Sequence, residues 1–230
     1  MVKELRSLAI PIKSSNDILF APRDHKICIL FVNYNSRGFL GKPVINDCAL
    51  FAEHLKTHYG YKCWYICNAK RSVAASVMKT FMSKKDAHLV IFYAGHGASI
   101  HDSNGDEKDG RDECFCFSDG YLVDDEFCNI INNNLQAKQL ICITDACHSG
   151  TIYDIERIKP ELKAKMTCLS SCADSQTSKQ LEKNGMFSLQ FWQCFDKNSK
   201  ILDFDKINKR LDWFDQKVIM YPPNNYKIDF

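Results

Sequence analysis

Two short segments of this chain hold residues that can do nucleophilic chemistry, Ala94–Gly97 and Asp145–Gly150. Each follows an apolar run whose length and composition are typical of a buried β-strand. His96 and Cys147 would then lie just past the carboxyl ends of two strands, where α/β folds place their reacting groups. A Cys and a His at such an edge predict thiol-based chemistry.

The chemistry that this pair predicts is acyl transfer. A cysteine attacks a carbonyl as its thiolate, and a neighbouring His can take the thiol proton and later return it. Cys147 would be the nucleophile and His96 the general base and acid. Gly97 leaves its backbone N–H open, so this group and the N–H of Cys147 can stabilise an oxyanion. Taken singly, such a Cys is more often a core residue and such a His a surface one, but their joint placement favours catalysis.

Alternating apolar and amphipathic segments predict the elements that would position this pair. Strands are expected at the apolar runs Lys26–Val32, Lys62–Cys67, His88–Tyr93, Gln139–Thr144, Met166–Ser170 and Lys217–Tyr221. Helices are expected at Ile45–His58, Arg71–Met82, Asp124–Asn134, Met186–Phe195 and Phe204–Phe214. This alternation predicts an α/β fold with a mostly parallel β-sheet flanked by helices on both faces.

Two stretches fall outside this alternation. Residues 1–24 precede the first strand, and we expect them to form an N-terminal extension, a mobile or regulatory arm, before one domain at 25–230. Residues 97–120 are rich in Asp, Gly, Glu and Ser, which predicts a long irregular loop of the kind that is usually functional or disordered.

Composition narrows the class of protein. The formal net charge of 230 residues is +2, without a basic tract, so charge points neither to nucleic acid nor to a membrane surface. No segment has the apolar length of a signal peptide core or a membrane span, so we expect a cytoplasmic monomer. Several of the twelve cysteines lie in apolar runs and none has C-x-x-C spacing, which indicates packing rather than zinc or disulfides.

The order of motifs from about Lys26 onward resembles the metacaspases, members of the caspase-like clan of cysteine peptidases. Tyr93–Gly97 is similar to the histidine block of that family and Asp145–Gly150 to its cysteine block. Shorter similarities follow the same order, at Ile45–Asp47 after Gly41, at Ser171–Ser178 and at Gly185–Ser188. The resemblance implies a caspase-like fold, a His96–Cys147 dyad, and an oxyanion hole at Gly97 and Cys147.

Two acidic residues lie near the predicted nucleophile. Asp145 precedes Cys147 by two residues, and Asp47 follows a predicted strand-to-helix turn on the same side of the sheet. Two carboxylates there favour a cationic side chain, and the resemblance likewise implies cleavage after Arg or Lys. The structural alternatives are a helix N-cap for Asp47 and a hydrogen-bonded turn for Asp145.

The chain departs from the family pattern at two positions that are thought to line the same pocket. Ala94 stands where the family usually has Ser, and Val44 stands where it often has Cys. Asp47 and Asp145 keep the acidic residues of the predicted pocket, whereas Val44 and Ala94 change two of the residues expected beside them.

The resemblance also implies a calcium site built from scattered aspartates, which match Asp112, Asp124, Asp125 and Asp154. Four converging carboxylates repel one another unless a divalent cation binds, and Ca²⁺ prefers oxygen ligands. The alternative for the residues that open the helix at Asp124 is acidic charge complementing the helix dipole.

The leading hypothesis is therefore a calcium-activated cysteine endopeptidase, with protein or peptide substrates that carry a basic P1 residue. One alternative is a caspase-fold scaffold that binds partners without catalysis. Another is a paracaspase-like member of the clan, which would share the dyad but not the aspartates.

Overall fold

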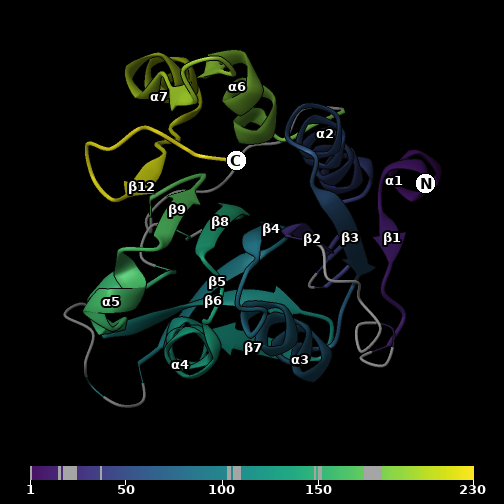
Figure 1. Ribbon diagram of the computed structural model, residues 1–230, viewed down its shortest axis with the longest axis vertical. Coiled ribbons are helices and arrows are strands. Elements are labelled where there is room, and N and C mark those ends of the chain that lie inside the picture. Colours follow the sequence, from purple (N-terminus) through teal and green to yellow (C-terminus); the bar gives the residue numbers. More distant parts are fainter. Residues whose placement is uncertain are drawn as a thin grey trace.

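The computed structural model describes residues 2–14, 17, 25–36, 38–102, 105, 110–147, 149, 152–173 and 183–230. Its centre is a seven-stranded sheet with the order β1-β3-β2-β4-β8-β9-β12 (Figure 1). The strands are β1 (Ile10–Pro11), β2 (Lys26–Val32), β3 (Lys62–Cys67), β4 (His88–Ala94), β8 (Gln139–Asp145), β9 (Met166–Ser170) and β12 (Ile219–Tyr221). All neighbours pair in parallel except β12, which is antiparallel to β9. The predicted fold class is confirmed.

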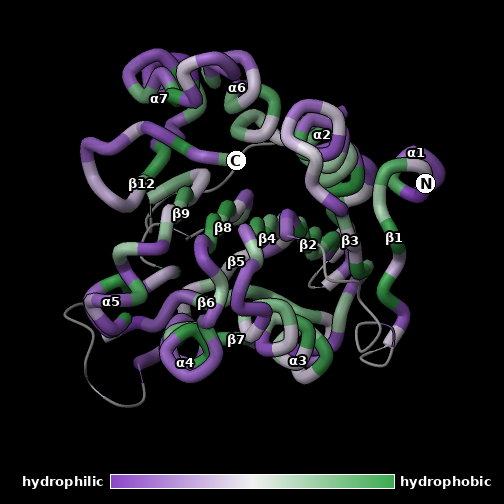
Figure 2. The backbone as a smooth tube through the Cα atoms, in the orientation of Figure 1, coloured by the Kyte–Doolittle hydropathy of each residue, from purple (hydrophilic) through white to green (hydrophobic). Residues whose placement is uncertain are grey.

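Helices cover both faces of this sheet (Figure 1). One face carries α1 (Lys3–Leu8), α2 (Lys42–Tyr59), α6 (Met186–Cys194) and α7 (Phe204–Leu211), and the other carries α3 (Arg71–Met82) and α4 (Asp124–Asn134). Alternate residues of β2 divide between the two cores, with Ile29 packed toward α3 and α4 and Leu30 toward α2 and α6. Figure 2 shows hydrophobic residues concentrated along the central strands. Buried β-branched and aromatic runs therefore form the strands, as their composition predicts.

The segment at 97–120 is not the irregular loop that we expected. It contains most of a three-stranded antiparallel sheet, β5 (Gly97–His101), β6 (Arg111–Phe117) and β7 (Gly120–Val123). Phe115, Phe117 and Leu122 pack into the core beside α3 and α4. The prediction was wrong because β6 opens with charged residues that are buried by tertiary contacts. Residues 103, 104 and 106–109 lie outside the described part of the chain.

The bounds of α2 change the interpretation of Asp47. The helix begins at Lys42, three residues before the predicted start, with Pro43 in its first turn, where proline is well tolerated. Its N-cap is Gly41, and Gly60 ends it in the left-handed conformation. Asp47 therefore lies in the second turn, and the N-cap alternative for it is wrong.

The remaining short elements lie between residues 155 and 214. They are η2 (Ile155–Arg157), α5 (Pro160–Lys163), the hairpin β10 (Phe195–Asp196) with β11 (Ile201–Leu202), and η3 (Asp212–Phe214). At one edge of the central sheet, β1 pairs with β3 through Ile10 and Trp64, so part of the expected N-terminal extension joins the sheet. Residues 18–24 of that extension lie outside the described part. Within the described residues, no helix is long and apolar enough to cross a membrane.

Candidate active site

The segments that carry His96 and Cys147 start side by side at the carboxyl edge of the sheet. Ala94 is the register partner of Asp145, and the Gly95 N–H donates to the Asp145 carbonyl at 3.3 Å. A Cβ added at Gly97 would overlap the backbone carbonyl of Cys147. The two backbones are thus in contact at a point that only glycine fits.

The orientation of His96 is set by a loop that the sequence analysis missed. Its Nε2 lies 3.3 Å from the carbonyl oxygen of Gly38. Because a carbonyl only accepts, Nε2 carries the proton in this contact, and Nδ1 is left as the acceptor. Gly38 has φ +127°, a conformation that favours glycine. The two glycines Gly38 and Gly41 before α2 were the available signal.

Hydrogen bonds from β6 and from Tyr93 fix the backbone of His96. Its carbonyl accepts from the N–H of Cys116 on β6 at 3.1 Å, and the Tyr93 hydroxyl lies 2.6 Å away. Burial raises the pKa of Tyr93 well above its usual value, so the hydroxyl stays a neutral donor. The small sheet thereby fixes the turn that presents the imidazole.

The residues after β9 support the turn that carries Cys147. Ser171 Oγ accepts from the Ala146 N–H at 3.2 Å, and Cys172 Sγ donates to the Ala146 carbonyl at 3.0 Å. Burial raises the pKa of Cys172 to about 11, so it remains a thiol at neutral pH. Cys147 is partly exposed, and none of the twelve cysteines, all within the described part of the chain, forms a disulfide. The later residues of the Ser171–Ser178 motif, from 174 onward, lie outside the described part, as does residue 148.

Asp47 and Asp145 converge on one glycine. The Gly185 N–H donates to the Asp47 carboxylate at 2.9 and 3.0 Å, and a Cβ at Gly185 would lie 2.8 Å from Asp145 Oδ2 and 2.9 Å from Asp47 Oδ2. Asn184 Nδ2 donates to Asp47 at 2.9 Å, and Ser188 Oγ donates to Asp145 at 2.7 Å. Asp47 and Asp145, which lie 138 and 43 residues along the chain from Gly185 and Ser188, thus form one buried acidic pair at the start of α6.

The two carboxyl groups of this pair are buried close to each other, and this raises the pKa of Asp47. Asp47 and Asp145 are only 2% and 7% exposed. Burial first, and then the charge of Asp145, raises the pKa of Asp47 well above its usual value, although Asn184 and Gly185 oppose this. Asn184, Gly185 and Ser188 donate to these oxygens without adding positive charge, and two adjacent carboxylates attract a cation.

The two positions that depart from the family pattern both lie in the core at this edge. Val44 is in the first turn of α2, and Ala94 ends β4 opposite Asp145. Both are buried in the cluster between the sheet and α2. Gly185–Ser188 was recognised as a motif without a role, and a glycine directly before a helix was the only local signal for its contact with the carboxylates.

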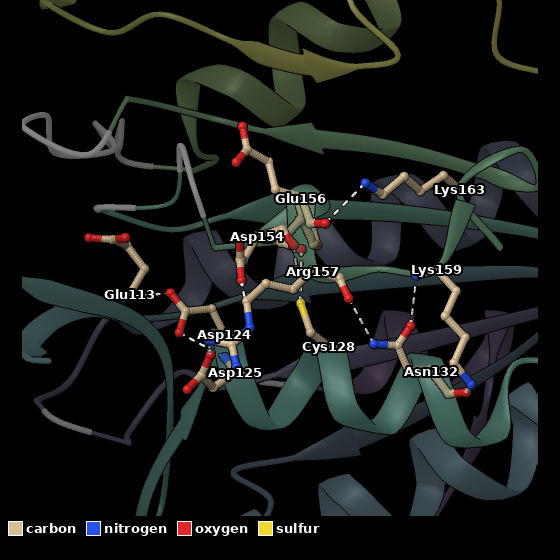
Figure 3. Close-up of polar contacts among 11 residues, drawn as sticks. Glu113, Asp124, Asp125, Cys128, Asn132, Asp154, Glu156, Arg157, Lys159 and Lys163 are labelled. Atoms are coloured by element: carbon tan, nitrogen blue, oxygen red, sulfur yellow. Dashed lines mark hydrogen bonds and ion pairs between the residues drawn. The ribbon is translucent and has the colours of Figure 1, made fainter. Parts of the chain in front are cut away.

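The structure also gathers the aspartates of the predicted calcium site. Asp124 and Asp125 open α4, Asp154 precedes η2, and Asp112 is buried near the start of β6. Asp124 accepts from the backbone N–H groups of Asp125 and Glu113 at 2.8 and 2.9 Å, so it also stabilises the first turn of α4 (Figure 3). Burial, with smaller contributions from the charges of Asp112 and Glu113, raises the pKa of Asp124 to about 7.

This donor set fits a calcium ion in its chemistry, because it offers carboxylate oxygens, the ligands that Ca²⁺ prefers. Among the described residues, however, no three His, Cys, Asp or Glu side chains are arranged to hold a metal as they stand. Arg157 pairs with Asp125, and its Nε lies 3.3 Å from Asp154 Oδ2 (Figure 3). Arg157 is a residue of this cluster that the sequence analysis missed.

Comparison with known proteins identifies the family. The family model described as Caspase domain matches residues 25–221. The chain belongs to the caspase domain family. The Neurospora crassa protein Metacaspase-1B is 33% identical over 153 residues, and the Phaeodactylum tricornutum protein Metacaspase III c is 38% identical over 146 residues. These matches confirm the resemblance to metacaspases.

The matches differ in extent. They cover 58% and 55% of this chain but only 36% and 43% of the two relatives, so this caspase domain spans less than half of their length. Among solved structures, caspase-1 from Spodoptera frugiperda aligns with TM-score 0.56 and 14% identity over 82% of this chain and 75% of that one. A protein from Geobacter sulfurreducens aligns with TM-score 0.62 and 19% identity over 88% and 97%. At these identities the two structures show the shared fold alone.

Proposed function

We propose that this caspase domain is a cysteine endopeptidase that hydrolyses peptide bonds after Arg or Lys. The observation that carries the proposal is the contact of the Gly97 and Cys147 backbones beside the buried Asp47–Asp145 pair. This arrangement supports the proposal, because a nucleophile at Cys147, a base at His96 and an acidic pair that attracts cations would share one edge of the sheet, as peptide hydrolysis beside a basic residue requires.

The mechanism begins with proton transfer. His96 Nδ1 takes the proton of Cys147 Sγ, while Nε2–H directed at the Gly38 carbonyl holds the ring and stabilises the imidazolium. The thiolate attacks the scissile carbonyl carbon, and the N–H groups of Gly97 and Cys147 stabilise the oxyanion. His96 returns the proton to the leaving amine, which breaks the C–N bond and leaves an acyl-enzyme. Water activated by His96 then hydrolyses the thioester.

Specificity follows from charge. A guanidinium or ammonium group that reaches Asp47 and Asp145 replaces their mutual repulsion by charge-assisted hydrogen bonds. Val44 and Ala94, which the resemblance places beside this site, are buried in the core, so the charge of the two aspartates carries the specificity. An aspartyl P1 residue would add a third negative charge to a buried pair.

Peptide reporters with Arg, Lys or Asp at P1 test this proposal. We expect cleavage of the Arg and Lys reporters only, and Cys147→Ala lowers kcat by at least about 10⁴-fold because it removes the nucleophile. Efficient cleavage after Asp by the pure protein would overturn the specificity, and activity retained by Cys147→Ala would overturn the mechanism.

We further propose that Ca²⁺ binds Asp112, Asp124, Asp125 and Asp154 and activates the peptidase. The ion would neutralise the cluster and bring together β6, α4 and the segment between Cys147 and η2, without taking part in the bond cleavage. Calorimetry with the inactive Cys147→Ala protein tests this site directly. Absence of binding, together with a cleavage rate that is independent of calcium, would remove it.

A further inference from the structure

Arg157 is a cation that belongs to the chain and lies inside the acidic cluster. It ends η2, and its guanidinium reaches Asp125 on α4 as well as Asp154 three residues earlier (Figure 3). The side chains of Arg157, Asp125 and Asp154 are 35%, 21% and 14% exposed. Ion pairs that are partly shielded in this way are screened by salt less than those on an open surface.

The neighbouring lysines make different contacts. Lys159 Nζ donates to the Asn132 carbonyl and Lys163 Nζ to the Glu156 carbonyl, both at 3.1 Å. Figure 3 shows the Lys159 side chain directed away from the aspartates and the Lys163 ammonium at the carbonyl of Glu156. Arg157, three residues after Asp154, reaches the aspartates, whereas Lys159 and Lys163, five and nine residues after it, donate to backbone carbonyls.

The guanidinium can leave the aspartates without unfolding η2. The Arg157 carbonyl accepts from Asn132 Nδ2 at 2.9 Å, and its N–H donates to the Asp154 carbonyl at 3.1 Å. These bonds hold the backbone of Arg157 independently of its side chain. Rotation about the side-chain bonds is therefore enough to exchange the guanidinium for another cation.

We propose that Arg157 is a tethered counter-ion that competes with Ca²⁺ for the carboxylates of Asp125 and Asp154, an inference that rests on the calcium site proposed above. A guanidinium and a calcium ion are both drawn to the charge of these carboxylates and repel each other, so Arg157 opposes calcium at Asp125 and Asp154 until it moves away. The competition lowers the affinity for calcium and raises the concentration at which the site fills. In the absence of calcium, Arg157 keeps α4 joined to the segment that follows Cys147.

Calorimetry of calcium binding tests this competition, with Cys147→Ala as the background so that no self-cleavage occurs. We expect Arg157→Gln to bind calcium about tenfold more tightly than the background protein, which corresponds to about 1.4 kcal/mol. Lys159→Gln is the matched control, because it removes the same charge two residues away without touching an aspartate. We expect it to change the affinity by no more than about twofold, since an exposed charge acts only through a screened field.

A thermal unfolding experiment in chelator gives a second readout. Arg157→Gln should lower Tm relative to Lys159→Gln, and saturating calcium should restore more of the loss in Arg157→Gln. Equal calcium affinities for Arg157→Gln and the background overturn the competition and leave the calcium site standing. Equal gains in Arg157→Gln and Lys159→Gln overturn it as well, because net charge alone would then explain them. Absence of binding in all three proteins overturns the calcium site and the competition with it.

Discussion

The two acidic sites of this domain both bring carboxylates close together, and they differ in the groups that contact those carboxylates. Asp47 and Asp145 are buried among neutral donors, an amide, a backbone N–H and a hydroxyl. The second cluster is more open, and it includes its own cation, Arg157, which pairs with Asp125 and Asp154. Neutral donors hold a carboxylate in place and leave its charge uncancelled, whereas a guanidinium cancels it.

The difference predicts different behaviour toward ligands. The pocket of Asp47 and Asp145 favours any cation that can reach it, which suits the recognition of each substrate in turn. The cluster with Arg157 is neutralised in part before any ion arrives, which suits a site that fills only above a threshold concentration. Substitutions at Asp47 and Asp145 should therefore change kcat/KM for basic reporters, whereas substitutions in the cluster with Arg157 should change calcium affinity and stability in chelator.

The largest effect is expected at Asp145. Asp145→Asn keeps the shape of the side chain but removes one of the two charges, and kcat/KM for an Arg reporter should fall about a hundredfold, because a charge-assisted hydrogen bond is worth about 3 kcal/mol at most. The free energy of unfolding should not fall, because the substitution removes the repulsion between the buried carboxylates of Asp145 and Asp47. Asp86→Asn, an exposed carboxylate at the amino end of β4, is the control. An unchanged kcat/KM in Asp145→Asn would remove the pocket from the account of specificity.

The next effect is a pH dependence with opposite signs for activity and stability. The pKa of Asp47 is raised from 3.8 in the folded chain, by burial first and by Asp145 second. Between the unfolded and the folded pKa the native state binds more protons, so this group stabilises the fold fully below the unfolded pKa, and the contribution is lost as pH rises through the folded pKa. Cation recognition needs the ionised form, so kcat/KM for an Arg reporter should fall as pH drops through the raised pKa.

The comparison with Asp47→Asn isolates this group from the other titrations. The difference in Tm between the two proteins should change across the acid range in the direction just given, and the acid limb of kcat/KM should lose the contribution of Asp47. A Tm difference that stays flat with pH would mean that the carboxyl of Asp47 titrates alike in the folded and unfolded chain.

How far the sequence predicts these sites depends on whether the signal is local. The bounds of β2, β3, α3, α4 and β9 follow the predicted ranges because each element carries its own apolar periodicity. The approach of the segments that carry His96 and Cys147 also follows, since adjacent parallel strands end at one edge of the sheet. The strands β5 to β7 were missed because buried Asp112 and Glu113 look like loop residues until their neighbours are known.

Partners that come from distant segments were not predictable. Gly38 meets His96 across 58 residues, and Gly185 meets Asp47 across 138. Each glycine marks a special backbone position, but nothing in the neighbouring residues identifies its distant partner, because these contacts arise from tertiary packing. Arg157 shows the converse, since it lies three residues from Asp154 and yet its second partner, Asp125, is on another helix.

A smaller effect is expected from the neutral donor of the pocket. Ser188→Ala removes the hydroxyl that donates to Asp145 at 2.7 Å and should lower the free energy of unfolding by about 1–2 kcal/mol, because a buried carboxylate loses a partner. The charge remains, so the preference for Arg over Asp should persist, and Ser188→Thr should restore part of the stability. Loss of that preference in Ser188→Ala would show that the hydroxyl, and not the charge, sets the specificity.

The smallest effect is expected in the second cluster without calcium. Asp154→Asn removes the carboxylate charge that Arg157 Nε faces at 3.3 Å and should lower the free energy of unfolding in chelator by about 0.5–1 kcal/mol, the range of a partly exposed ion pair. Glu156→Gln makes the same charge change on an exposed side chain two residues away and should stay within about 0.5 kcal/mol of the unsubstituted protein. Denaturant unfolding measures both. If Asp154→Asn is no less stable than Glu156→Gln, then Arg157 does not neutralise Asp154. The proposed difference between the Asp47–Asp145 pair, which has neutral donors, and the second cluster, which contains Arg157, would then be wrong.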